Sequence, residues 1–145
     1  MQFIWYTSEI NNSNHWGGTY VSYNQASALK YLGHKVQLLD PASDFSFYVN
    51  KLKPDWVYLP VEFTQYPCYY NILHYKKIYN YNIVIGVGIF EKWVENIKGW
   101  DILITQWYGE GIKKFPHRLH FIPHGFNPKL HFPTKQKNIY DAVFI

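Results

Sequence analysis

The sequence predicts an α/β domain with a doubly wound parallel sheet between two helical layers. Short apolar runs alternate along the chain with longer stretches in which apolar residues recur near helical spacing, the pattern of successive βαβ units. The chain of 145 residues has the length of one domain and is long enough to bury a core. Its 48% apolar and 17% charged residues are the balance of a globular protein.

Six apolar runs are expected to be the strands of this sheet: residues 3–6, 36–39, 56–59, 83–87, 102–105 and 119–122. Turn residues bound them, as Asp40 and Pro41 do after the second run and Gly88 does after the fourth. Six parallel strands joined through helices make a Rossmann-like doubly wound sheet. In such a sheet ligands bind beyond the carboxyl ends of the strands, so the loops that follow the strands are the places to look for a site.

Five stretches between the strands are expected to be helical: residues 19–32, a stretch from Ser43 or Asp44 to Leu52, 69–79, 91–97 and 110–115. Ser43 or Asp44 can cap the second helix, and Gly99 ends the fourth. Gly33 stands where the C-cap glycine of the first helix belongs. His34 follows it, where an imidazole meets the helix dipole, and is interpreted as structural.

The sequence changes character after residue 126, so residues 1–126 are expected to be one Rossmann-like domain. Residues 127–139 carry Pro128, Pro133, several lysines and little apolar periodicity, which is typical of a linker. The segment YDAVFI, residues 140–145, then indicates a fresh strand. We expect it to be the first strand of a further, C-terminal domain.

Composition narrows the classes of partner. The net charge of +4 and the pI near 9.0 permit an anionic partner such as a nucleotide or a membrane surface. Arg118 is the only arginine, which disfavours nucleic acid, because arginine is the usual residue for reading bases. Cys68 is the only cysteine, which excludes an internal disulfide and fits the cytoplasm.

No targeting or membrane segment is expected. The amino-terminal residues have no basic region of a signal peptide, and no run approaches the roughly 18 apolar residues of a spanning helix. Contact with a membrane is therefore expected to be peripheral and weak at most, with Lys76 and Lys77 facing anionic lipid.

Gly17 and Gly18 lie between the first strand and the first helix. Glycines there let a phosphate approach the backbone, and the helix N-terminus supplies free N–H groups and a partial positive charge. The dinucleotide fingerprint G-x-G-x-x-G is absent, and the loop of about ten residues is longer than the tight turn of that fingerprint. A loop with a glycine helix start and no ligand explains the pair equally well.

Three segments resemble the N-terminal half of GT-B glycosyltransferases. The run GGTYVSYNQASALKYLGHKVQLLD resembles their opening, and FIPHGFNPKLHFP resembles the segment that closes the N-terminal half, with His124 for the usual Asn and Asn127 for the usual Asp. The final YDAVFI resembles the strand that opens the C-terminal half. In order and spacing the three segments span nearly the whole chain. The HGF and YDAVF forms are most similar to the spore-maturation-protein-like branch of the family 4-like glycosyltransferases.

The resemblance implies a transferase that uses a nucleotide-sugar donor in a cleft between two Rossmann-like halves. It implies that this N-terminal half binds the acceptor, a glycan, lipid or protein, while Gly17 and Gly18 approach the donor phosphates. It also implies that the half present here needs its own C-terminal domain and is inactive without it. No cofactor is expected in this domain beyond the donor, which is a substrate.

Loop residues at the ligand-facing edge are the candidates for chemistry. A retaining enzyme of this family is thought to use the leaving phosphate of the donor as base, whereas an inverting enzyme needs a carboxylate or histidine. His15 and Glu91 are the catalytic candidates on this basis. The expected acceptor-binding residues are Trp16, Glu62, Phe90, Trp107 and His124. Aromatic rings stack on sugar faces, but such residues also commonly fill a core or its rim.

Two other classes of function stay open. One is a non-catalytic Rossmann-like binding or interaction module. The other is a zinc-dependent hydrolase, suggested by four histidines that lie within fifteen residues: His117, His120, His124 and His131. Prolines interrupt that segment and no histidine pair lies four apart on a helix, so no metal site is expected.

Overall fold

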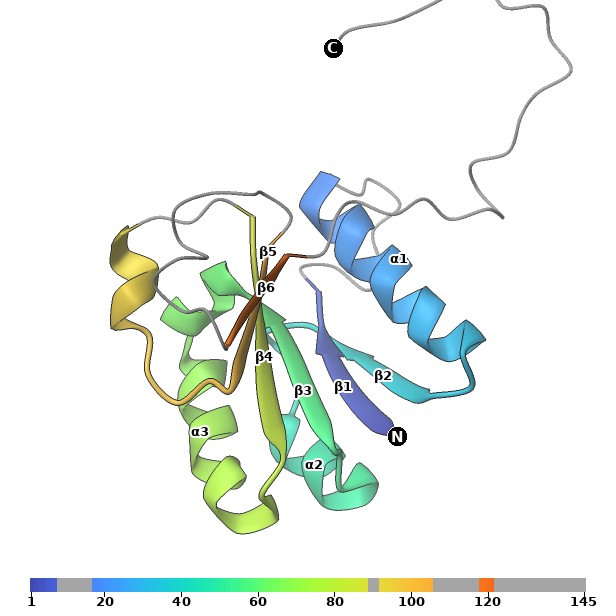
Figure 1. The fold of residues 1–145 in the computed structure, drawn as a ribbon. Coiled ribbons are helices and arrows are strands. Elements are labelled where there is room, and N and C mark those ends of the chain that lie inside the picture. Colours follow the sequence, from blue (N-terminus) through green and yellow to red (C-terminus); the bar gives the residue numbers. More distant parts are fainter. Residues whose placement is uncertain (8–16, 89–91, 106–117, 122–145) are drawn as a thin grey trace, which may run out of the picture.

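The computed structural model describes residues 1–7, 17–88, 92–105 and 118–121, and all six expected strands form there. The strands are β1 Gln2–Tyr6, β2 Lys35–Leu39, β3 Trp56–Pro60, β4 Asn82–Val87, β5 Ile102–Thr105 and β6 Leu119–Phe121. They make one parallel sheet in the order β2-β1-β3-β4-β5-β6 (Figure 1). The chain winds outward in one direction from β1 and in the other from β3. The fold is therefore a Rossmann-like parallel α/β fold, as predicted.

Three α-helices and two short 3₁₀-helices connect the described strands. They are α1 Gly17–Tyr31, α2 Phe45–Leu52, α3 Pro67–Tyr79, η1 Val61–Gln65 and η2 Lys92–Asn96. The first three helices were predicted, although α3 begins two residues earlier than expected, because proline is favoured at the first helical position. The expected helix 91–97 is the 3₁₀-helix η2, since five residues form too few hydrogen bonds to nucleate an α-helix. The segment of η1 was expected to be a loop.

Three predicted features lie outside the described residues. They are the helix at 110–115, the linker at 127–139 and the strand at 140–145.

The two faces of the sheet are covered differently. Helices α2 and α3 pack on one face, where the larger core holds fully buried strand residues such as Ile4, Val57 and Ile83 (Figure 1). On the other face α1 packs over β1 and β2, with Ala26 buried in one cluster with Trp5 and Tyr58. These apolar residues on alternating sides explain why the strands appear in the sequence as continuous apolar runs.

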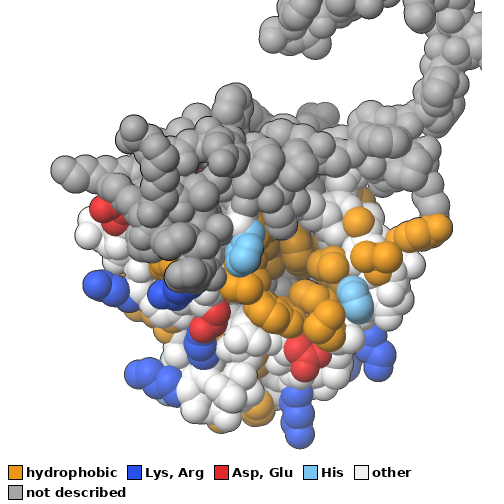
Figure 2. Space-filling model, in the orientation of Figure 1, with side chains coloured by type: hydrophobic (Ala, Val, Ile, Leu, Met, Phe, Trp, Pro, Cys, Tyr) orange, Lys and Arg blue, Asp and Glu red, His pale blue; other side chains and the backbone are white. Residues whose placement is uncertain are grey.

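The face covered by α1 is only partly shielded by the described residues. Val84 and Ile104, on β4 and β5, are partly buried there and pack against the Trp5 cluster. Figure 2 shows hydrophobic side chains gathered beside α1 on this side of the molecule. Among the described residues, the helical cover of the α1 face is thus confined to one flank of the sheet.

Local signals at the helix ends account for the element boundaries. Asp44 caps α2 by accepting hydrogen bonds from the Ser46 and Phe47 amides. A hydrogen bond from the Ser46 hydroxyl, together with these two amides, lowers the pKa of the Asp44 carboxyl. After α1, Gly33 has φ +84°, its amide donates to the Lys30 carbonyl, and the His34 amide donates to the Leu29 carbonyl. This pair of hydrogen bonds is a Schellman motif, which confirms the predicted C-cap.

His34 has the structural role predicted for it. Its ring lies 5.5 Å from that of Phe3 and is half-buried at the amino end of β1. Helices α2 and α3 end at the predicted residues, Leu52 and Tyr79. The sequence did not predict that Lys53 and Asn80, which follow them, adopt the left-handed conformation without being glycine.

Replacing Gly33 by alanine is expected to lower the free energy of unfolding by about 1 kcal/mol, because a left-handed backbone is unfavourable for a residue with a Cβ. The added Cβ would meet no atom within 4 Å, so the backbone alone accounts for the effect. Urea denaturation measures it. Gly88→Ala is the matched control, since that position is equally open without a positive φ, and it should leave stability unchanged or slightly raised. Equal losses in the two variants would contradict the Schellman assignment.

Candidate ligand site at the carboxyl edge of the sheet

The candidate site lies at the carboxyl ends of β1 and β3, the neighbouring strands from which the chain winds in opposite directions. In doubly wound sheets this switch point is where ligands bind. Because α1 connects parallel strands β1 and β2, it runs antiparallel to them and begins at this edge (Figure 1). Gly17 and Gly18, the predicted phosphate-binding residues, are its first two residues.

A buried aromatic pair joins the two strands below the edge. Trp5 of β1 and Tyr58 of β3 are directly opposite each other, and their rings are stacked with centroids 3.7 Å apart and planes 14° apart. Both side chains are almost fully buried against α1. Stacked rings on adjacent strands fix the local separation and tilt of β1 and β3.

Ser22 of α1 connects the helix to this pair. Its hydroxyl accepts a hydrogen bond of 2.8 Å from the Trp5 indole N–H and donates one of 3.3 Å to the Tyr6 carbonyl. The same hydroxyl lies close enough to that of Tyr58 to affect its pKa. Burial raises the pKa of Tyr58, the Ser22 hydroxyl opposes that rise, and the charge of Glu62 adds to it. Tyr58 therefore stays a neutral phenol at physiological pH.

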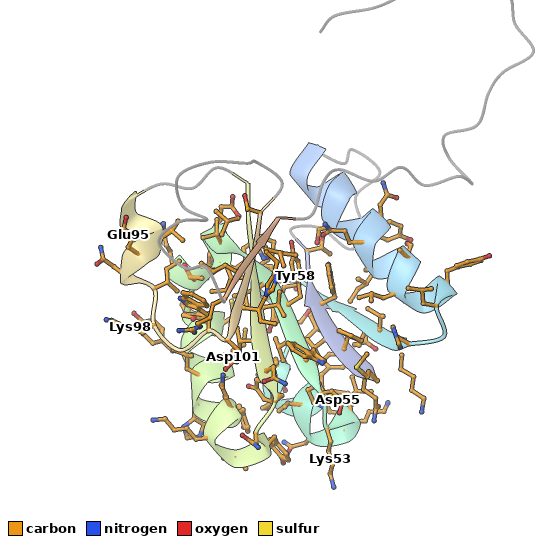
Figure 3. All side chains as sticks on the ribbon, in the orientation of Figure 1. Lys53, Asp55, Tyr58, Glu95, Lys98 and Asp101 are labelled. Carbon is orange, nitrogen blue, oxygen red and sulfur yellow. The ribbon has the colours of Figure 1, made fainter. Side chains whose placement is uncertain are left out.

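Gly86 of β4 makes room for Tyr58. A Cβ built on Gly86 would overlap the Tyr58 hydroxyl and lie 2.8 Å from its Cζ atom. The Tyr58 side chain thus leans from β3 over the backbone of β4 toward the carboxyl edge. Figure 3 shows Tyr58 in the middle of the sheet, away from the labelled charged residues.

Two hydroxyls near the end of β1 have no hydrogen-bond partner among the described residues. Thr7 is 1% exposed, and Tyr6 is 0% exposed. Tyr6 points into the larger core, where its ring lies near Phe45 and Phe63, and its pKa is raised by burial and by Cys68 and Asp40. Unpartnered buried polar groups are rare in native proteins, so each one needs an explanation.

Glu62 is the one predicted acceptor-binding residue that the structure describes. It lies in η1, directly after β3, and its side chain is exposed. Its charge acts on Tyr58, so the two side chains share the carboxyl edge. Glu62 and the start of α1 therefore lie at the same edge of the sheet, on the neighbouring strands β3 and β1.

The other predicted site residues lie outside the described part of the chain: His15, Trp16, Phe90, Glu91, Trp107 and His124. Conversely, three residues at this edge were missed. Thr7, Ser22 and Tyr58 were not assigned to the site. Thr7 was detectable as a polar residue directly after an apolar strand, whereas Ser22 and Tyr58 were hidden in a helix and a strand.

The charged contacts of the described residues elsewhere are structural. Lys76 of α3 forms an ion pair with Asp101, which also accepts a hydrogen bond of 2.7 Å from the Ile83 amide. Arg118 stacks on Trp100, with its guanidinium carbon 3.7 Å from the ring centroid. Lys76, for which contact with anionic lipid was predicted, has its ammonium paired with Asp101.

Neither a metal centre nor a membrane span is found in the part of the chain that the structure describes. No group of three His, Cys, Asp or Glu side chains there is placed to hold a metal ion, and of the four clustered histidines only His120 is described. No described helix has the length and apolar character needed to cross a bilayer.

Comparison with known proteins identifies no family for this chain. No protein-family model, curated protein or solved structure matches the chain.

Replacing Gly86 by alanine is expected to lower the free energy of unfolding by about 1–3 kcal/mol, because the new methyl group overlaps Tyr58. The double variant Gly86→Ala, Tyr58→Phe should recover part of this loss, since the hydroxyl is the atom nearest to the added carbon. Urea denaturation of the two single variants and the double variant completes the thermodynamic cycle. Strictly additive effects would show that the two positions do not interact.

Proposed function

We propose that this chain is the acceptor-side, N-terminal domain of a GT-B glycosyltransferase that transfers a sugar from a nucleotide-sugar donor to a glycan, lipid or protein. The observation that carries the proposal is the position of Gly17 and Gly18. They open α1 at the carboxyl edge of a Rossmann-like sheet, beside the switch point between β1 and β3. The sequence resemblance to GT-B enzymes begins at the same two glycines.

The start of α1 is suited to a phosphate group. The first amides of a helix have no intrahelical acceptor, and the helix dipole favours an anion there. The first turn of α1 contains no acidic residue that would occupy this position. Two glycines in succession leave the backbone accessible to the diphosphate of a nucleotide sugar.

The acceptor is proposed to lie along the same edge, over the loops that follow β3, β4 and β5. The proposal assigns to Glu62 a hydrogen bond from an acceptor hydroxyl, and its exposure in η1, the helix that follows β3, supports this role. In the transfer, the bond between the anomeric carbon and the leaving phosphate breaks, and the acceptor oxygen bonds to that carbon. The acceptor proton passes to the leaving phosphate in a retaining enzyme, or to His15 or Glu91 in an inverting one.

This domain supplies one wall of a cleft, and the proposal requires a second domain for the nucleotide. A cytoplasmic location goes with the proposal, in keeping with a single, buried cysteine. Alone, the chain is expected to transfer little or no sugar.

The test is a donor screen on a protein that includes whatever the reading frame encodes after Ile145. Transfer from one nucleotide sugar is expected, and Gly17→Val should reduce kcat/KM by at least tenfold, because the valine side chain crowds the phosphate. Circular dichroism and thermal unfolding of the same variant show whether the fold is intact. Unchanged kinetics would remove the phosphate role of the glycine pair. Absence of transfer from every donor would favour the non-catalytic binding module.

A further inference from the structure

We propose that the buried hydroxyl of Thr7 is a direct ligand of an oxyanion of the phosphate or diphosphate class, bound at the first turn of α1. The inference rests on the proposed function, since it concerns the same donor site. It adds a residue, Thr7, that neither the sequence motifs nor the family resemblance assign.

The first observation is the state of the Thr7 side chain. Thr7 follows the last residue of β1 and is 1% exposed, yet its Oγ1 has no hydrogen-bond partner among the described residues. Its backbone is held, since the Thr7 amide donates a hydrogen bond of 2.9 Å to the Leu39 carbonyl. The hydroxyl is therefore fixed in place without a partner. A group kept in this state is a candidate for contact with a ligand.

The second observation is the position of Thr7 under α1. Side chains alternate along a strand, so Thr7 is on the same face as Trp5, which contacts Ser22 of α1. From Trp5 to Thr7 the strand advances by roughly 6.6 Å toward the carboxyl edge. From Ser22 back to Gly18 the antiparallel helix advances by roughly 6 Å in the same direction. Gly18 is thus the residue of α1 that comes over Thr7.

This juxtaposition explains why a glycine occupies position 18. Ser22 and Gly18 are one helical turn apart and face the sheet together. Glycine at position 18 brings no side chain between the helix and Thr7. The amides of the first turn, which have no intrahelical acceptor, and the Thr7 O–H would be the hydrogen-bond donors to the ligand.

The donors determine the class of ligand. A ligand that satisfies several N–H groups and a hydroxyl must offer several acceptor oxygens, as a phosphate or diphosphate does. The positive end of the α1 dipole favours its negative charge, and no acidic residue in the first turn opposes it. The unpartnered Tyr6 hydroxyl lies on the opposite face, in the larger apolar core, where the charge of Asp40 would repel an anion.

Tyr6 therefore offers a matched control. Tyr6→Phe and Thr7→Val each remove one buried, unpartnered hydroxyl while keeping the shape of the side chain. Because neither hydroxyl has a partner among the described residues, neither change should lower the melting temperature of the unliganded chain. Only Thr7→Val should affect an anion at α1.

The experiment is isothermal titration calorimetry of the intact 145-residue chain with inorganic pyrophosphate, and with acetate as a carboxylate comparison. Wild type is expected to bind pyrophosphate and not acetate. Thr7→Val should weaken pyrophosphate binding by about tenfold or more, the effect of losing a hydrogen bond to a charged group. Thr7→Ser keeps the hydroxyl and should bind within about threefold of wild type, as should Tyr6→Phe.

Three results would overturn the inference. In the first, Thr7→Val binds pyrophosphate as wild type does; if Gly17→Val then weakens binding, the phosphate role of the glycines stands without Thr7. In the second, Thr7→Val lowers the melting temperature along with the affinity while Thr7→Ser restores both, which is a structural role. In the third, wild type does not bind pyrophosphate. The donor screen on the longer protein decides the proposed function separately from all three.

Discussion

The stacked pair of Trp5 and Tyr58, tied to α1 through Ser22, is the interaction on which the arrangement of the carboxyl edge depends. It joins β1 to β3 at the switch point and connects both strands to the helix that begins above them. One serine hydroxyl engages both aromatic side chains and the β1 backbone, so the axial position of α1 is fixed relative to the sheet. Gly86 belongs to the same unit, because Tyr58 occupies the space that a side chain at position 86 would need.

The two edges of the sheet differ in how their polar groups are satisfied. At the amino edge, Asp55 forms hydrogen bonds with the backbone of both neighbouring strands. The Gln2 amide donates to the Asp55 carboxylate, the Asp55 amide donates to the Gln2 carbonyl, and the Asn82 amide donates to the Asp55 carbonyl. At the carboxyl edge Thr7 has a buried hydroxyl without a partner among the described residues, and α1 begins without an acidic residue in its first turn. A protein that leaves donors unsatisfied loses stability there, and such positions are typical of sites that bind ligands.

Much of the fold was predictable because it depends on local signals. Strands buried on both faces appear as apolar runs, and Asp44, Pro67 and Gly33 mark helix ends by their own chemistry. The prediction was incomplete where no local signal exists. It gave the last residues of α2 and α3, but not the left-handed conformation of Lys53 and Asn80 that follow them. It did not predict the 3₁₀-helix η1, and it gave η2 as a helix without its 3₁₀ type.

Residue patterns alone predicted the alternation of strands and helices, and with it the edge of the sheet at which Gly17 and Gly18 lie. Apolar periodicity and turn residues are sufficient for this, because each acts within a few residues of the chain. Only the tertiary structure decided which side chains meet there. Trp5, Ser22 and Tyr58 lie on β1, α1 and β3, and their hydrogen bonds and stacking follow from the register of parallel strands and the position of the helix. The sequence likewise does not reveal that the Thr7 hydroxyl lacks a partner among the described residues, because this depends on all the groups that surround it in space.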